Sequence, residues 1–206
     1  MITSLEIQKR NKNKVNLYID GEYRCALTAE SVVSARLKIG QELTEGQLKD
    51  ILEGSETQIA FDKSLNYISR SMKTIKQVAD YLKRKGFEES VIVKAIDKLK
   101  NYKYVDDELY ASMYVESQKG SKGEIRLKQE LLLKGVDKEI IQTKLSNLDQ
   151  QDSLLAAKKT AQKFIKNKQQ DEKLKLKLYR HLLSRGFDYE TVNSVANLLD
   201  SVMLTE

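Results

Sequence analysis

Apolar residues recur at helical spacing through most of the chain after residue 58. Positions i, i+3, i+4 and i+7 lie on one face of an α-helix, so apolar side chains at this spacing predict a buried helix face. Three such stripes occupy matching places: Ile92, Ala95, Ile96 and Leu99; Ile141, Leu145 and Leu148; and Val192, Val195, Ala196 and Leu199. Another stripe precedes each of them: Phe61, Leu65, Ile68 and Met72; Leu109, Tyr110, Met113 and Tyr114; and Leu154, Ala157, Ala161 and Phe164.

A glycine motif comes directly before each stripe of the first set. The three copies are Leu82–Phe87, Leu131–Val136 and Leu182–Phe187, and their glycines are 49 and then 51 residues apart. Glycine enters the left-handed conformation without a Cβ clash, so it is favoured just past a helix end. We predict a Schellman cap in each copy, with the leucine packed against the apolar residue after the glycine. The basic residue before each glycine suits the negative end of the helix dipole.

Acidic residues two positions after the glycines predict where the next helices begin. Asp137 and Asp188 are expected to act as N-caps, and Glu88 stands at the same place as a weaker one. Self-similarity at this period is typical of stacked helical units. We therefore predict a mainly α fold, a tandem array of three three-helix modules behind a small N-terminal β-hairpin/helix extension. The predicted boundaries are 1–57, 58–105, 106–148 and 149–206. The alternative, an ordinary all-α domain with chance glycine spacing, does not explain why the leucine, basic and apolar positions all repeat together.

The first 57 residues follow a different pattern. Ile2, Leu5 and Ile7 open a strand-like run, and residues 15–19 alternate apolar and polar side chains. Asp20-Gly21 is a strong hairpin signal before the return strand of residues 23–27. Thr28 is expected to cap a short helix, and Thr44-Glu45-Gly46-Gln47 resembles a capping box. This segment could cover the exposed end of the first module, as terminal caps do in repeat proteins.

Positive charge is unevenly distributed along the chain. The net charge is only +6, but residues 58–105 hold 11 Lys+Arg against 5 Asp+Glu, and residues 158–180 hold nine against two. Such basic stretches suit a polyanion or an acidic protein surface, although solvated helix faces explain most lysine runs. No 18-residue apolar run and no apolar signal core are present, so we expect a cytoplasmic protein without a membrane span.

The side chains offer little catalytic chemistry. His181 is the only histidine and Cys25 the only cysteine, which excludes His-dependent triads, a disulfide framework and clusters of His or Cys ligands. The acidic run Asp106-Asp107-Glu108 is expected to cap the following helix rather than bind a metal. The segment Gly120-Ser121-Lys122-Gly123 lacks the spacing of a phosphate-binding loop and is read as a short basic connection between helices. We expect no enzymatic activity, no cofactor and no metal.

Two segments of the middle module carry a specific family signature. The run from Tyr104 to Ala111, followed by the run from Lys122 to Val136, resembles the central signature of the RecX family. The segment Tyr81–Phe87 fits the pattern of that family's first module, and the resemblance covers essentially the whole chain. Family members often show Arg-Pro-Arg-Ser where this chain has Ser71-Met72-Lys73-Thr74, so the capping role is expected to pass to Thr74.

The resemblance implies a regulator in DNA repair, recombination and the SOS response. Members of the family bind RecA and modulate, usually by inhibition, the filament that RecA forms on DNA. The curved array is thought to lie in the helical groove of that filament. The absence of a long exposed heptad repeat favours a monomer.

Basic side chains are the predicted partner contacts. We select three in each module: Lys83, Arg84 and Lys85; Lys122, Arg126 and Lys128; and Lys175, Lys177 and Arg180. A filament-binding regulator without catalysis is the first hypothesis. A direct nucleic-acid-binding helical module, with weak DNA binding of its own, is the alternative, and the two functions are compatible.

Overall fold

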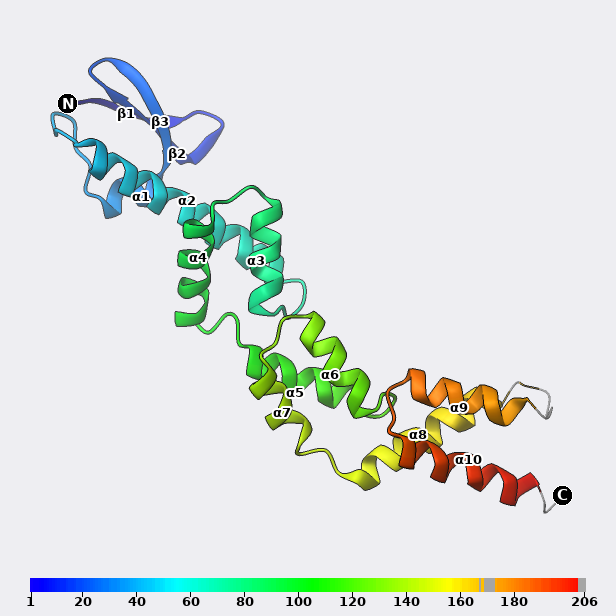
Figure 1. Ribbon diagram of the computed structural model, residues 1–206. Coiled ribbons are helices and arrows are strands. Elements are labelled where there is room, and N and C mark those ends of the chain that lie inside the picture. The colour runs from blue at the N-terminus through cyan, green and yellow to red at the C-terminus, as the bar shows by residue number, and fades with distance from the viewer. Residues whose placement is uncertain (167, 169–172, 204–206) are drawn as a thin grey trace. The chain divides into compact units, whose positions relative to one another are not determined.

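The computed structural model describes residues 1–166, 168 and 173–203, with side chains as far as residue 198. A three-stranded antiparallel sheet is followed by helices grouped in threes (Figure 1). The chain divides into two compact units, residues 1–73 with 77–105, and residues 74–76 with 106–206. The predicted mainly α class, with an N-terminal β-containing extension and three groups of three helices, is confirmed.

The sheet forms the N-terminal part of the first unit. Its strands are β1 (Ile2–Gln8), β2 (Asn11–Ile19) and β3 (Glu22–Thr28), in that order. β2 and β3 pair around the predicted Asp20-Gly21 turn, where both residues have positive φ. Thr28 caps α1 (Ala29–Ser34) by accepting a hydrogen bond from the Ser31 amide. The core between sheet and helices contains Ile2, Leu17, Leu27, Leu37 and Leu48.

Helix α2 (Glu45–Ile68) joins the sheet to the first three-helix group. It opens with the predicted capping box, in which Thr44 accepts from the Gln47 amide and the Gln47 side chain accepts from the Thr44 amide. The predicted helix after Thr44 and the predicted stripe from Phe61 are thus one helix of 24 residues. It ends at Ile68, so the prediction that Met72 continues the stripe is wrong, and Met72 is 39% exposed. The boundary at residue 57 stays a prediction.

Helices α3 (Ile75–Arg84) and α4 (Glu89–Asn101) complete this group. The described helices of the second unit are α5 (Asp107–Gln118), α6 (Glu124–Leu133) and α7 (Lys138–Leu145), followed by α8 (Gln150–Ile165), α9 (Leu174–Ser184) and α10 (Tyr189–Met203). The predicted stripe of α4 is buried throughout. That of α10 is buried at Val192, Val195 and Ala196, while the side chain of Leu199 lies outside the described residues.

The face assigned to α5 is partly wrong. Leu109 and Met113 are 51% and 57% exposed, whereas Ala111 and Val115 are buried. The helix turns these two small residues toward the core of Leu127, Leu131 and Ile141, because both neighbouring helices approach it from that side. Tyr110 and Tyr114 only partly enter this core.

All three glycine motifs form the predicted cap. Gly86, Gly135 and Gly186 have φ of +84°, +83° and +82°. In each copy the residue after the glycine donates to the leucine carbonyl: Phe87 to Leu82 at 3.3 Å, Val136 to Leu131 at 3.1 Å, and Phe187 to Leu182 at 3.3 Å. This is the Schellman pattern, which satisfies carbonyls that the helix end leaves open.

The predicted N-caps are confirmed except at the first motif. Asp137 accepts from the Glu139 amide at 2.7 Å, and Asp188 accepts from the Thr191 amide at 2.8 Å. Asp106 likewise caps α5 by accepting from the Leu109 amide at 2.9 Å. Glu88 occupies the N-cap position of α4 but makes no side-chain cap bond.

Candidate partner-binding surfaces

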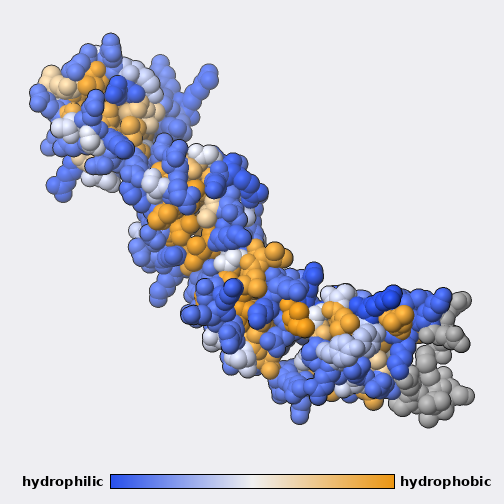
Figure 2. All heavy atoms as spheres, in the orientation of Figure 1, coloured by the Kyte–Doolittle hydropathy of each residue, from blue (hydrophilic) through white to orange (hydrophobic). Residues whose placement is uncertain are grey.

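Hydrophilic side chains dominate the face of the molecule in Figure 2, with smaller apolar areas between them. The first predicted set of basic residues, Lys83, Arg84 and Lys85, is exposed around the C-terminal end of α3. Lys85 Nζ lies 5.6 Å from the centre of the Tyr81 ring, and Arg84 Nε donates to the Asp80 carbonyl at 3.2 Å. None of the ion pairs among the described residues involves these three cations. Their charge is therefore open to an anionic partner.

In the second predicted set, Lys122 and Arg126 pair with Glu130, whereas Lys128 does not. The Glu130 carboxylate accepts from Lys122 Nζ at 2.6 Å and from Arg126 Nε at 2.8 Å, and the Tyr114 hydroxyl donates to it as well. The side chains of Lys122 and Glu130 are only 19% and 16% exposed. Lys122 and Arg126 thus share one carboxylate at a helix surface and hold α5, α6 and their connection together. Lys128 is exposed and pairs with no acid that the structure describes.

The proton affinities of this cluster follow from its contacts. Burial alone would raise the pKa of the Glu130 carboxyl, but hydrogen bonds from Lys122, Tyr114 and Arg126 outweigh it and lower the pKa to about 2. The pKa of the Tyr114 hydroxyl is raised by burial and by its hydrogen bond to Glu130. Glu130 is therefore ionised and Tyr114 protonated at neutral pH, which is the state in which this network is strongest.

The third predicted set lies on α9. Lys175, Lys177 and Arg180 are exposed, and Leu176 between them is 52% exposed. Leu174, Leu178 and Leu182 are buried on the opposite face of the helix. The basic side chains thus lie outward because the leucine spacing fixes the inner face.

A close backbone approach connects the last two helix groups. Gly123 N donates to the Arg185 carbonyl at 3.0 Å, and Ile125 N donates to the Gly186 carbonyl at 3.2 Å. A Cβ atom on Gly123 would lie 2.1 Å from the Gly186 oxygen, and one on Gly186 would lie 2.2 Å from Arg126 N. The α9–α10 turn therefore docks on the first turn of α6, and only glycine fits at either place.

The α6–α7 turn makes the equivalent contact within the second unit. A Cβ on Gly135 would lie 2.2 Å from Cδ of Lys76. The fully buried Thr74 donates its hydroxyl hydrogen to the Lys134 carbonyl at 2.6 Å, and the Ile75 amide donates to Asp107 at 2.9 Å. At Gly86, by contrast, a Cβ would meet nothing within 4 Å. Gly186 therefore docks two helix groups of the second unit as well as capping a helix, and Gly135 packs against Lys76.

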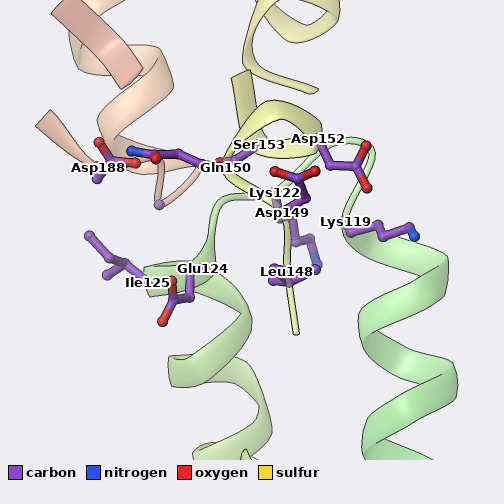
Figure 3. A pocket seen from close by; sticks show the side chains of 11 residues that line it. Lys119, Lys122, Glu124, Ile125, Leu148, Asp149, Gln150, Asp152, Ser153 and Asp188 are labelled. Carbon is purple, nitrogen blue, oxygen red and sulfur yellow. The ribbon is translucent and has the colours of Figure 1, made fainter. Parts of the chain in front are cut away.

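A mixed-charge hollow of about 350 Å³ lies beside the Gly123–Gly186 contact (Figure 3). Its carboxylates include Asp149 and Asp188, whose oxygens already accept helix-capping bonds from Gln151 and Thr191. The predicted reading of Gly120–Gly123 as an inter-helix connection is confirmed, since it lies between α5 and α6. Among the described residues no group of three or more His, Cys, Asp and Glu side chains could hold a metal ion. The hollow is better explained as a structural seam than as a metal site.

An aromatic cluster in the first unit was not selected from the sequence. The Phe61 ring lies 5.9 Å from that of Tyr102 and 6.2 Å from that of Tyr104, and Lys98 Nζ lies 4.5 Å from its centre. Both tyrosines are more than half exposed. The two tyrosines at 102 and 104 were the available signal, since aromatic side chains are enriched at binding surfaces.

Three groups of capped helices with basic side chains on their outer faces define a class: a helical-repeat protein. None of the described helices is both long and apolar enough to span a membrane.

Comparison with known proteins makes the assignment specific. Models of the RecX N-terminal domain and of the first, second and third RecX three-helix domains match residues 1–44, 60–99, 106–145 and 151–195. The chain therefore belongs to the RecX family of regulatory proteins, as its resemblance implied. This is a family without enzymatic activity, so the prediction that the chain is not an enzyme is confirmed.

Individual relatives agree along nearly the whole chain. The regulatory protein RecX of Clostridium beijerinckii is 39% identical over 94% of this chain and 93% of its own length. That of Clostridium perfringens is 38% identical over 96% and 95%, respectively. A crystal structure of regulatory protein RecX matches with a TM-score of 0.75 at 26% identity, covering 95% of this chain and 98% of its own. The structure of RecX from Lactobacillus salivarius matches with a TM-score of 0.62 at 25% identity, covering 71% and 98%.

Proposed function

We propose that this protein acts in the cytoplasm as a monomer that binds RecA and its filament on DNA and restrains recombinase activity. The observation that carries the proposal is that all four parts of a RecX protein occur in order along this chain. The basic outer faces of α3 and α9 support a partner with negative charge. The predicted module boundaries, 58–105, 106–148 and 149–206, are part of the same proposal.

The α3 set is the contact on which we place most weight. Lys83, Arg84 and Lys85 are exposed, adjacent and free of ion pairs among the described residues, whereas Lys122 and Arg126 already share Glu130. An exposed ion pair contributes about 0.5 kcal/mol, so three of them contribute about 1.5 kcal/mol, or roughly tenfold in affinity. Lys128 and the α9 set Lys175, Lys177 and Arg180, which belong to the second unit, are further contacts in the proposal.

A RecA filament assay tests the proposal. Increasing amounts of the protein should reduce the DNA-dependent ATPase activity of a cognate RecA filament. Changing Lys83, Arg84 and Lys85 to Glu should raise the concentration for half-inhibition about tenfold or more. The matched control changes Lys9, Arg10 and Lys12 to Glu, an equal change of charge on exposed residues around the β1–β2 turn. An unchanged ATPase rate across a wide range of wild-type protein would refute the proposal.

Direct nucleic-acid binding is the second candidate, favoured by the excess of 11 Lys+Arg over 5 Asp+Glu in residues 58–105. It predicts a log–log slope of affinity against salt of about −0.7 to −0.9 for each phosphate neutralised. Inhibition of the filament by a variant that no longer binds free DNA would show that this activity is not the regulatory one.

A further inference from the structure

A second hollow, of about 330 Å³, lies in the second unit and is distinctly basic. Lys159 and Lys163 line it from α8, His181 and Arg185 line it from α9 and its C-cap, and Ser121 lines it from the α5–α6 turn. No carboxylate belongs to its lining. In this it differs from the hollow of Figure 3, where Glu124, Asp149, Asp152 and Asp188 offset the lysines.

Local structure fixes the walls of this basic hollow. Lys159 and Lys163 are one helical turn apart on the outer side of α8, because Ala157 and Ala161 are buried on its inner side. His181 and Arg185 are likewise one turn apart. The His181 ring stacks on Phe164 with centres 4.4 Å apart, which ties α9 to α8. Backbone bonds hold the base of Arg185, whose amide donates to the His181 carbonyl at 3.1 Å.

No acid of the described residues pairs with the lysines and the arginine of the hollow. Burial lowers the pKa of His181, and the charges of Arg185 and Lys168 lower it further. Lys168 Nζ lies 3.4 Å from the centre of the Phe164 ring, next to the stack. Lys159, Lys163 and Arg185 therefore line the hollow with His181, and no carboxylate is part of the lining. Such a site favours an anion.

We propose that this basic hollow binds a phosphate group. Guanidinium and ammonium groups are the usual protein ligands of phosphate, and here one arginine and two lysines converge on one concave site. Its volume is at the lower end of ligand pockets, which suits a single phosphate with its attached group rather than a large cofactor. The phosphate can come from a nucleic-acid backbone or from a free nucleotide. The proposal needs no RecA, so it stands or falls separately from the proposed function.

A bound anion would favour the protonated form of the His181 imidazole. Its ring stacks on Phe164, whose own ring Lys168 contacts, and Lys159, Lys163 and the α9 C-cap Arg185 line the same hollow. A bound phosphate offsets the field of these cations and raises the pKa of the imidazole. Binding should therefore tighten as the pH falls through that pKa.

The single histidine of the chain supplies the readout. Inorganic phosphate, titrated into the full-length protein at constant ionic strength set with chloride, should shift the His181 imidazole NMR signal and raise its pKa. Changing Lys159 and Lys163 to Gln should weaken this response at least tenfold. The matched control changes Lys138 and Lys173 to Gln, which removes the same charge from exposed residues of the same unit outside the hollow.

Two further arms distinguish the sources of phosphate. A fluorescent single-stranded oligonucleotide is followed by anisotropy, and ATP is followed by the His181 signal. A tenfold loss of oligonucleotide affinity in the Lys159/Lys163 variant, but not in the control, assigns the hollow to nucleic acid. Loss of the ATP response alone assigns it to a nucleotide. A His181 signal that moves with neither inorganic phosphate nor ATP, or that moves equally in the Lys159/Lys163 variant, overturns the proposal.

Discussion

Three glycines, at positions 86, 123 and 186, allow backbone strain and docking to be measured separately. Gly86 and Gly186 have nearly the same positive φ, +84° and +82°, but a Cβ meets open space at the first and the backbone of Arg126 at the second. Gly123 has an ordinary φ of −80°, yet a Cβ there would lie 2.1 Å from the Gly186 oxygen. Gly86→Ala therefore adds backbone strain alone, and Gly123→Ala adds the docking clash alone. Gly186→Ala adds both.

The expected losses follow from these differences. A non-glycine residue in the left-handed conformation costs about 1–2 kcal/mol, which sets the loss for Gly86→Ala. Gly123→Ala must separate the α9–α10 turn from α6 and break two backbone hydrogen bonds. At about 1 kcal/mol each, these cost about 2 kcal/mol. Gly186→Ala carries both losses, about 3–4 kcal/mol in sum.

Hydrogen exchange of the intact protein directly measures how much the contact between α6 and the α9–α10 turn is weakened. The Ile125 amide bonds across the contact, so Gly123→Ala should raise its exchange about 30-fold, the equivalent of 2 kcal/mol. Gly86→Ala is the matched control and should leave this amide unchanged while lowering the urea midpoint of the first unit. Wild-type protection of Ile125 in Gly123→Ala, or an equal loss from Gly86→Ala and Gly186→Ala, would refute the reasoning.

Three further substitutions test the network, the core and the caps. Glu130→Gln should cost about 2–3 kcal/mol in urea unfolding at pH 7. Because folding lowers the Glu130 pKa from 4.5 to about 2, the wild type should lose this advantage as the pH falls through that range, and a variant with the same acid sensitivity would contradict the assignment. Leu182→Ala, at a fully buried site, should cost about 3 kcal/mol, against less than about 1 kcal/mol for its half-exposed neighbour Leu183→Ala. Asp188→Ala should cost about 1 kcal/mol by thermal unfolding, whereas Glu88→Ala, which removes no cap bond, should cost almost nothing; equal effects would argue against the capping account.

Local chemistry explains which features the sequence predicted well. A Schellman cap depends on a glycine and the residues around it, so three caps and the N-caps at Asp137 and Asp188 followed from short segments. The capping box at Thr44 and the Asp20-Gly21 turn are similarly local. These features hold wherever the segment is placed in the fold.

Features that depend on distant contacts were missed. Helical spacing cannot say which of two apolar faces meets a neighbour, and Leu109 and Met113 proved to lie on the outer face of α5. The sequence assigns Gly123 only to a loop, because the Gly186 carbonyl that excludes a side chain there comes from a segment more than 60 residues away.

The pairing of Arg126 with Glu130 could be predicted from their i, i+4 spacing. It makes the second basic set a weaker candidate for partner contacts than the first. Whether any of the nine selected cations touches a partner stays a prediction. The basic hollow could not be found from spacing, since its residues come from three separate segments.

Helix α2 gives the first unit a property that the element list alone does not convey. At 24 residues it is about 36 Å long, and one stretch of it packs against the sheet while another packs against α4. Ser55, near its middle, accepts a hydrogen bond from the Thr28 amide at the end of β3. The helix is part of the core of the sheet and part of the core of the first three-helix group. A chain cut at residue 57 would therefore leave each fragment with an incomplete core. The N-terminal sheet and helices α1–α4 should therefore unfold as a single cooperative block, because α2 contributes to the packing of both parts.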